Sequence, residues 1–249
     1  YTKSDYFRYN TTRKEKPNMN AQKLSKRLEK VASFVPENTI VADIGSDHAY
    51  LPCYLVLNHI ATKVIAGEVV KGPYESACHE VKQEGLQNQI TVRLADGLQA
   101  IEQEDHITVI TIAGMGGPLI ASILEKDVKR LTGVKRLILQ PNIHAIAIRE
   151  WAVQRNWKII DESILKEDGK IYEILVLEPG GQLLSAEALL LGPVLMQQQN
   201  DVFKEKWSHE IEQWQTVLKA LEKAGRSEEI IEKQKSLEQR IKMVKEILQ

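Results

Sequence analysis

The residues best suited to chemistry lie in the segment VADIGSDHAYLP, residues 41–52. Asp43 is near the end of a short apolar run, Gly45 permits a tight turn, and a polar loop then leads into an expected helix. With an acidic residue at a strand end, a glycine turn and a helix start, an α/β sheet can approach a nucleoside-containing cofactor. The first hypothesis is therefore a cofactor-dependent enzyme.

Polar or small residues also follow four later apolar runs, where each run is expected to end. They are Glu68 and Val69, Asp96 and Gly97, the run Ala113, Gly114, Met115, Gly116 and Gly117, and Pro141 with Asn142. Ligands of an open parallel sheet bind at the carboxyl ends of its strands. We therefore expect these positions to share one site with the first loop, which contributes Gly45, Ser46, Asp47, His48 and Tyr50.

The first loop favours one kind of cofactor over another. A dinucleotide fingerprint needs glycines where this chain has Gly45, Asp47 and Tyr50, so the cradle for a pyrophosphate is missing and NAD is disfavoured. S-adenosylmethionine has no phosphate and carries a sulfonium and an ammonium, which nearby carboxylates attract. The loop therefore suits S-adenosylmethionine better.

Two further acids have both a binding role and a plainer interpretation. Glu68, twenty-three positions after Gly45, is placed to accept both hydroxyls of a ribose, or is a solvated strand end. Asp96 is placed to contact the exocyclic amine of the cofactor's adenine, or forms an ordinary Asp-Gly turn with Gly97. His48 and Tyr50 either line the cofactor pocket or simply pack.

The segment AGMGGP, residues 113–118, ends the fourth strand almost without side chains. This leaves room for a flat substrate beside the cofactor, although a tight strand-to-helix turn with Pro118 in the first helical turn explains it equally well. No Asp/Asn-Pro-Pro-aromatic loop, typical of enzymes that methylate the amino group of adenine or cytosine, occurs there. Methylation of a pyrimidine at C5 would need a cysteine nucleophile, and Cys53 falls in the expected first helix after the loop rather than after strand four. We interpret Cys53 and Cys78 as small packing residues, and we expect no metal site.

Short apolar runs that alternate with helical segments must position these residues. Strands are expected at residues 39–44, 63–69, 90–94, 107–113 and 136–140, and an antiparallel closing pair at 157–165 and 171–177. Helix-length connections between the first five imply βαβ units and a parallel sheet. An amphipathic helix precedes them, with apolar positions from Leu24 to Val35, and Pro36 ends it.

The chain is expected to divide into three parts: an extension at residues 1–18, a catalytic domain at 19–180 and a helical domain at 181–249. Met19 is the expected natural start, and the preceding residues are expected to be mostly disordered. A Pro-Gly-Gly linker at 179–181 is followed by two helices that break at 225–227, with apolar spacing typical of an antiparallel coiled coil. Their Phe/Trp stripe favours seam packing over RNA stacking.

The composition bears on the cellular compartment of the protein and on its affinity for nucleic acid. The net charge is −1, so any affinity for nucleic acid must come from a local patch. Residues 1–30 hold nine Lys/Arg against three Asp/Glu, and the basic positions of the expected helical region are Lys23, Lys26, Arg27 and Lys30. Two cysteines, no CxxC and no long apolar run indicate a reduced, cytoplasmic protein that does not enter membranes.

Five segments together resemble a known family. They are ADIGSDHAYLP, AGE at 66–68, ADGL at 95–98, TIAGMGG at 111–117 and LILQPN at 137–142. With the helical hairpin after them, they closely resemble the bacterial TrmK family, the tRNA adenine-N1 methyltransferases that act on adenine 22. The resemblance covers residues 19–249. It implies a Rossmann-like class I methyltransferase sheet, mostly parallel with an antiparallel last strand, S-adenosylmethionine as cofactor and tRNA as partner.

The resemblance also implies roles for individual residues. Ring N1 of adenine attacks the methyl group without a nucleophilic side chain, so catalysis depends on positioning and on groups that favour a cationic ring. Asp43 is expected to act as the electrostatic catalyst or to form a hydrogen bond near the exocyclic amine of the base, with binding of the cofactor ammonium as the competing role. Asn142 and the backbone of Gly114 to Gly116 are expected at the base. The basic residues at 23–30 and the hairpin are expected to clamp tRNA.

Two other functions stay compatible with the sequence. A methyltransferase for a small molecule or protein would use the hairpin for dimerisation, although a monomer is favoured. A non-catalytic RNA-binding module on the same scaffold is the second, and the acidic series Asp43, Glu68 and Asp96 argues against it.

Overall fold

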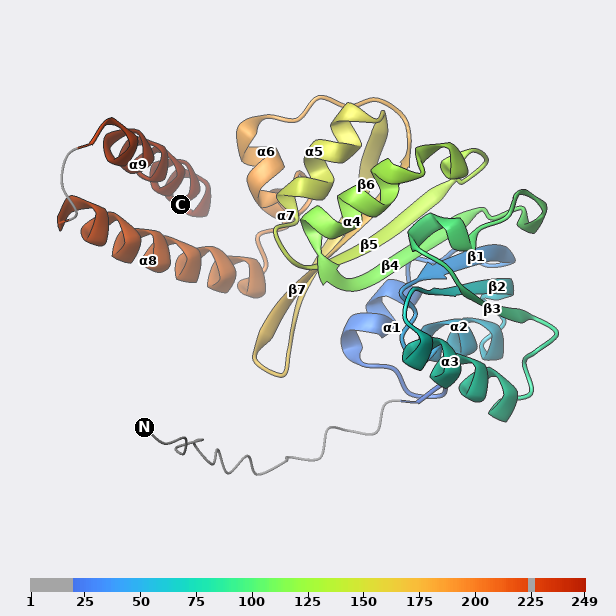
Figure 1. Ribbon diagram of the computed structural model, residues 1–249. Helices are drawn as coiled ribbons and strands as arrows, with labels where there is room; N and C mark the ends of the chain where they lie inside the picture. Colours follow the sequence, from blue (N-terminus) through green and yellow to red (C-terminus); the bar gives the residue numbers. More distant parts are fainter. Residues whose placement is uncertain (1–19, 224–226) are drawn as a thin grey trace, which may run out of the picture.

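A seven-stranded sheet forms the centre of the protein, and the computed structural model describes residues 20–223 and 227–249 (Figure 1). The strands are β1 (Thr39–Ile44), β2 (Ala61–Glu68), β3 (Ile90–Leu94), β4 (Val109–Gly116), β5 (Arg136–Ile143), β6 (Trp157–Glu167) and β7 (Lys170–Pro179). Their spatial order is β3-β2-β1-β4-β5-β7-β6. The pairs from β3 to β5 are parallel, and β7 runs antiparallel to both β5 and β6. The chain order therefore reverses between β1 and β4, where such sheets bind ligands.

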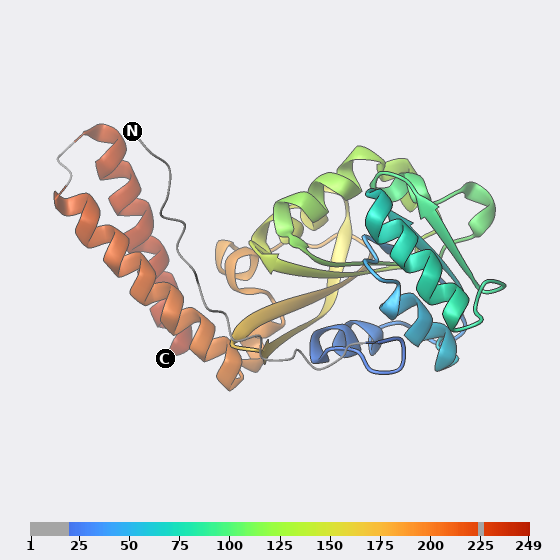
Figure 2. The same ribbon diagram turned by 60° about the horizontal axis from the view of Figure 1, so that its bottom comes forward.

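Helices cover both faces of the sheet (Figures 1 and 2). The long helices of the sheet domain are α1 (Lys26–Ala32), α2 (Tyr50–Leu57), α3 (Lys71–Gln83), α4 (Gly117–Lys126) and α5 (Ile146–Gln154), and the 3₁₀ turns are η1 (Gly97–Ala100), η2 (Gln103–Asp105) and η3 (Val128–Leu131). Apolar side chains of α1, α2 and α3 pack on one face, and those of α4 and α5 pack on the other.

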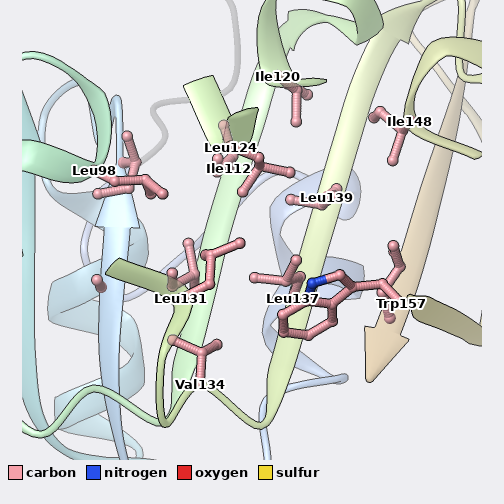
Figure 3. Packing of buried hydrophobic residues seen from close by; sticks show 14 of the residues in the cluster. Leu98, Ile112, Ile120, Leu124, Leu131, Val134, Leu137, Leu139, Ile148 and Trp157 are labelled. Atoms are coloured by element: carbon pink, nitrogen blue, oxygen red, sulfur yellow. The ribbon is translucent and has the colours of Figure 1, made fainter. Parts of the chain in front are cut away.

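Successive side chains of a strand point to opposite faces of the sheet, so each central strand contributes to a hydrophobic core on either face. In β5, Leu137 and Leu139 point to the α4/α5 side, whereas Ile138 points to the α1/α2/α3 side, and all three are fully buried. Figure 3 shows the core on the α4/α5 side, with Ile120 and Leu124 of α4 among the labelled side chains around β4 and β5. Strands buried on both faces are typical of parallel sheets between helical layers, so this core fixes β4 and β5, whose ends carry the site.

Four helices follow the sheet: α6 (Ala186–Leu191), α7 (Leu195–Gln198), α8 (Asp201–Lys223) and α9 (Glu228–Leu248). α8 and α9 lie side by side and project from the antiparallel side of the sheet (Figure 2). Phe203 and Trp207 of α8 are buried against Ile164 of β6 and Val244 of α9. Phe203 and Trp207 thus pack in the seam between the two helices, as the spacing favoured, and also against the sheet, whereas Trp214 is only partly buried.

A buried charge cluster reinforces the same junction. Arg149 of α5 is fully buried and donates to Glu162 of β6 at 2.8 Å and to Glu173 of β7 at 2.5 Å. Glu173 also accepts from Lys206 of α8, and Glu162 accepts from the Val194 backbone N–H at 2.9 Å. Two positive and two negative charges from four elements, α5, β6, β7 and α8, are therefore matched at the place where the hairpin leaves the sheet.

The fold expected from the sequence is confirmed, and several boundaries differ. β4 continues three residues past the expected end, and β5 also continues to residue 143, so Gly114, Met115, Pro141 and Asn142 lie within strands rather than after them. The closing hairpin narrows to Asp168 and Gly169, both with positive φ (49° and 75°), as a tight Asp-Gly turn requires. The extension at 1–18, the start at Met19 and two of the three break residues lie outside the described residues.

Candidate active site

A pocket of about 370 Å³ lies at the carboxyl ends of β1 and β4, where the chain order reverses. Its walls bring together residues from five parts of the sequence: Arg27, Leu28, Asp43, Gly45, Ser46, Asp47, Tyr50, Leu51, Ala113, Gly114, Met115, Asn142 and Tyr172. Eight of these residues were expected to contact the cofactor or the base. The list also contains Asp43, which was expected both to act in catalysis and to bind the cofactor, and Arg27, which was expected to bind tRNA.

The first loop adopts an unusual backbone. Gly45 has φ +73°, a left-handed conformation that favours glycine, and the terminal methyl of Met115 lies where a β-carbon would be. Asp47 and Ala49 also have positive φ, at 54° and 56°, which is unfavourable for residues with side chains. Such strain persists where surrounding contacts enforce it, and it is concentrated at functional sites. His48 stacks on Tyr50 with ring centroids 5.3 Å apart, and of these two only Tyr50 lines the pocket.

Asp43 is the buried acid of the pocket. Only 3 % of the residue is exposed, and its Oδ1 accepts a hydrogen bond from the Thr111 hydroxyl at 2.5 Å. Burial raises the pKa of Asp43 to about 7, while the Thr111 hydrogen bond acts in the opposite direction. An acid with this pKa is partly ionised near neutrality, so a cationic ligand can draw it into its charged form.

Glu68 lies under the first loop at the end of β2. Its Oε1 accepts from the Ser46 hydroxyl at 3.1 Å, and the residue is 5 % exposed. The pocket-lining residues do not include it. A carboxylate that accepts from one hydroxyl is chemically suited to accept from a ribose hydroxyl as well.

The other expected cofactor residues lie farther along the strand ends. Val69 is 63 % exposed directly after β2. Asp96 is paired with Lys126 of α4, with 2.6 Å between Oδ2 and Nζ, so an adenine amine would have to compete with that lysine. Gly97 has φ +57° and faces Ile123 closely, consistent with the turn interpretation of this dipeptide.

Two side-chain amides from β5 hold the end of β4. The Gly114 N–H donates to Gln140 Oε1 at 2.9 Å, and the Gly114 carbonyl accepts from Asn142 Nδ2 at 2.7 Å. Gln140 in turn donates to Asn142 Oδ1 at 3.3 Å. Gly114 is therefore bulged out of the β4–β5 ladder with both backbone groups occupied. For the expected contact with a base, the Gly114 N–H would have to leave Gln140, whereas the carbonyl keeps a second lone pair.

The next glycines have different surroundings. A β-carbon at Gly117 would overlap the carbonyl of His144, so the turn into α4 packs directly on the turn into α5. At Gly116 the nearest atoms would lie 3.9 Å away. Neither glycine lines the pocket, and Pro141 lines a separate, larger cleft of about 610 Å³ between the sheet and the hairpin. Asn142 lines both cavities, so the two adjoin there.

The basic residues around α1 separate into two groups. Lys23 and Lys26 are exposed, and Lys30 lies over the Phe34 ring at 4.6 Å. Arg27 instead points into the pocket, where it donates to Gln140 Oε1 and lies over the Tyr172 ring at 5.4 Å. Arg27 therefore does not lie on the exposed basic face that the sequence led us to expect. The reason is that Glu167 of β6 accepts from the backbone N–H groups of residues 26 and 27, which fixes the orientation of α1.

Sequence reasoning missed three polar residues of the site. Thr111 and Gln140 are fully buried, and Tyr172 lines the pocket from β7. Gln140 interrupts the apolar run LIL in β5, and a buried polar residue at a strand end is a signal that could have identified it. Tyr172 lies in the closing hairpin, and no local pattern in the sequence connects it to the first loop.

Comparisons with known proteins agree on one family. A family model described as TrmK: tRNA (adenine(22)-N(1))-methyltransferase matches residues 41–246. A tRNA (adenine(22)-N(1))-methyltransferase of Bacillus subtilis (strain 168) is 49% identical over 237 residues, which cover 92% of this chain and 99% of that protein. This chain belongs to the TrmK family.

Two solved TrmK-type structures were determined with ligands. A putative tRNA (m1A22) methyltransferase of Streptococcus pneumoniae in complex with S-adenosyl-L-methionine is 47% identical, with a TM-score of 0.78 over 90% of this chain and 99% of that one. The M. capricolum TrmK in complex with S-adenosyl-homocysteine is 28% identical, with a TM-score of 0.80 over 90% and 97%.

The pocket of this TrmK-family chain fits S-adenosylmethionine. It lies where the chain order reverses, and its walls combine carboxylates with one guanidinium. A methionine zwitterion with a sulfonium needs both charge types. Within residues 20–223 and 227–249, no cluster of His, Cys, Asp and Glu could hold a metal, and no helix is long and apolar enough to span a membrane.

Proposed function

We propose that this protein transfers a methyl group from S-adenosylmethionine to N1 of adenine 22 in tRNA. Membership of the TrmK family supports this reaction. The observation that carries it in the structure is the position of Asn142, which lines both the cofactor-sized pocket and the larger cleft beside the hairpin. A nucleotide held in the cleft can therefore reach the pocket at this residue.

The described residues suit direct attack by the ring nitrogen. S-adenosylmethionine supplies an electrophilic methyl group, and adenine N1 has an in-plane lone pair, so no enzyme nucleophile is needed. Cys53 could not serve as one, because burial raises the pKa of its thiol to about 12. Asp43 in its ionised form favours the positive charge that arrives on the ring or is already on the cofactor. Asn142 Oδ1 accepts one hydrogen bond from Gln140 and keeps a lone pair for an N–H of the base.

The larger cleft offers a place for RNA outside the pocket. N1 lies on the Watson-Crick edge, so a paired target base must leave its helix before it reacts. The cleft is lined by Trp214 and His209 of α8, Arg240 of α9 and His144 of the turn before α5. Lys206 also lines it but is paired with Glu173, and Glu205 and Glu210 add negative charge. Aromatic faces and cations are the groups that bind unstacked nucleotides and phosphates. The exposed Lys23 and Lys26 extend the proposed contact to the tRNA backbone.

The decisive experiment measures transfer of labelled methyl from S-adenosylmethionine to unmodified tRNA and maps the product by a reverse-transcription stop. We expect a stop at adenine 22 with wild type and its loss with Asp43→Ala. No incorporation into several tRNAs by a folded, cofactor-binding wild type would exclude the tRNA reaction and favour a small molecule or protein as substrate. A folded wild type that binds tRNA but no cofactor would indicate a non-catalytic RNA-binding module.

A further inference from the structure

Ile143, the last residue of β5, has an apolar side chain that the fold leaves uncovered. The residue is 62 % exposed, and none of the three hydrophobic clusters of the described residues includes it. Single exposed apolar residues are common on protein surfaces, so exposure alone assigns no role. The position distinguishes Ile143, because it directly follows Asn142, where the cofactor-sized pocket and the larger cleft adjoin.

Ile143 lies on the cleft side of this junction. It lines the larger cleft and not the pocket, whereas Asn142 lines both. Trp214 of α8 and Arg240 of α9 line the same cleft, and such groups can bind an unstacked nucleotide and its phosphate. A nucleobase that moves from the cleft into the pocket therefore passes Asn142 with Ile143 beside it.

The surroundings hold Ile143 in a fixed position. It pairs with Gly116 in the β4–β5 ladder, and the carbonyl of the next residue, His144, packs against Gly117 at the start of α4. A β-branched side chain also has little freedom about χ1. Ile143 is therefore a stiff apolar projection, which has little freedom to lose when it is inserted between other groups.

The proposed reaction needs such a projection. Adenine N1 lies on the Watson-Crick edge, so the base must leave its stack, and the space that it vacates favours its return unless another group fills it. Nucleic-acid-binding proteins insert apolar side chains, isoleucine among them, between base steps. A polar side chain would have to lose its hydration to enter a stack, whereas Ile143 would bury apolar surface that is now exposed to water.

We infer that Ile143 is a wedge that enters the tRNA stack beside adenine 22 and keeps the base out of its helix while N1 is in the pocket. The inference rests on the proposed function, because it takes tRNA as the substrate. Ile143 contacts the bases next to the target and takes no part in methyl transfer, so it is a positioning residue.

The test measures single-turnover methylation by Ile143→Ala on two forms of tRNA. One is unmodified tRNA, and the other has an abasic site opposite adenine 22, so that less pairing and stacking opposes extrusion of the base. At saturating protein, the variant should methylate unmodified tRNA about 10- to 100-fold more slowly than wild type. On the abasic tRNA the difference should shrink to less than about threefold, because extrusion no longer limits the rate.

Two further variants serve as controls. Ile160→Ala removes the same side chain from another exposed strand position, which lines neither cavity, and it should methylate both tRNAs like wild type. Ile143→Met keeps an apolar wedge and should retain most of the rate on unmodified tRNA. Calorimetric titration with S-adenosylhomocysteine should give the same affinity for all three variants, which shows that the pocket is intact.

Three results would overturn the inference. Wild-type rates with Ile143→Ala on unmodified tRNA would show that no wedge is needed. An equal defect on both tRNAs would assign Ile143 to tRNA binding or to the shape of the passage, and weaker binding of S-adenosylhomocysteine would assign it to the pocket. Wild-type protein that methylates neither tRNA would overturn the proposed function itself, a result distinct from an effect confined to the variant.

Discussion

Burial of Asp43 gives the pocket an acid whose charge depends on its surroundings. The folded protein raises the pKa of this carboxyl to about 7, above the value of about 4 expected in the unfolded chain. The folded state therefore holds the proton more tightly than the unfolded state. Asp43 reduces stability progressively as the pH rises from about 4 to about 7, and the reduction is complete above that range.

Asp43→Asn should remove this cost while its amide oxygen keeps accepting from Thr111. Without ligand, we expect the variant to melt at a higher temperature than wild type at pH 8 and at nearly the same temperature at pH 4, measured by calorimetry. Methyl transfer should be lost. A constant difference in melting temperature between pH 4 and pH 8 would contradict the ionisation argument.

The close packing at Gly117 leads to a second prediction, on stability, for which the neighbouring Gly116 provides the control. Gly117→Ala would place a β-carbon on the His144 carbonyl, so the turns into α4 and α5 would have to separate. We expect a loss of about 1–3 kcal/mol in the free energy of unfolding. Gly116→Ala has open space and an ordinary φ of −73°, and it should change stability by less than about 0.5 kcal/mol. Similar urea midpoints for both variants would refute the close-contact explanation.

At the scale of elements, the ends of some strands were predicted correctly and those of others were not. β1 and β3 have both predicted ends, because their β-branched runs are bounded by turns. β4 and β5 are longer than predicted, because Gln140 and Asn142 bind the backbone of Gly114 and continue the strands through a bulge. That contact joins residues 26 or more positions apart, so no local pattern reveals it.

The orientation of α1 illustrates the same limit. The sequence correctly predicted a helix in this region and could not show which side chains point inward. Arg27 enters the pocket because Glu167, 140 positions away, accepts from its backbone N–H. The strand-end residues were predictable, since parallel strands place their carboxyl ends together. The partners contributed by α1 and β7 were not predictable in this way.

The junction with α5 carries a prediction at the scale of elements. Arg149→Met would leave Glu162 and Glu173 buried next to each other with one cation, Lys206, for both. We expect the free energy of unfolding to fall by about 3–5 kcal/mol. Arg155→Met, just past the end of the same helix, breaks the exposed pair with Glu125 and should lower the free energy of unfolding far less, because water screens that pair. Chemical denaturation measures both variants, and an equal loss of unfolding free energy in the two would contradict the importance of the buried charge cluster.

At the scale of the whole molecule, the net charge of −1 cannot attract tRNA by itself. Attraction must come from local cations, and the residues that line the cleft beside the hairpin include Arg240 of α9 and His144 of the turn before α5. The same cleft meets the pocket at Asn142. The hairpin thus forms one wall of the route to the pocket.

Arg240→Ala should therefore weaken tRNA binding and leave the affinity for S-adenosylhomocysteine unchanged. If Arg240 neutralises one phosphate, the slope of log affinity against log salt should become shallower by about 0.9. Lys242→Ala removes the same charge two positions along α9, on a different side of the helix that does not line this cleft. It should leave the slope nearly unchanged. Filter binding between 50 and 300 mM salt measures both, and equal changes would show that the hairpin attracts tRNA by overall charge rather than through the cleft.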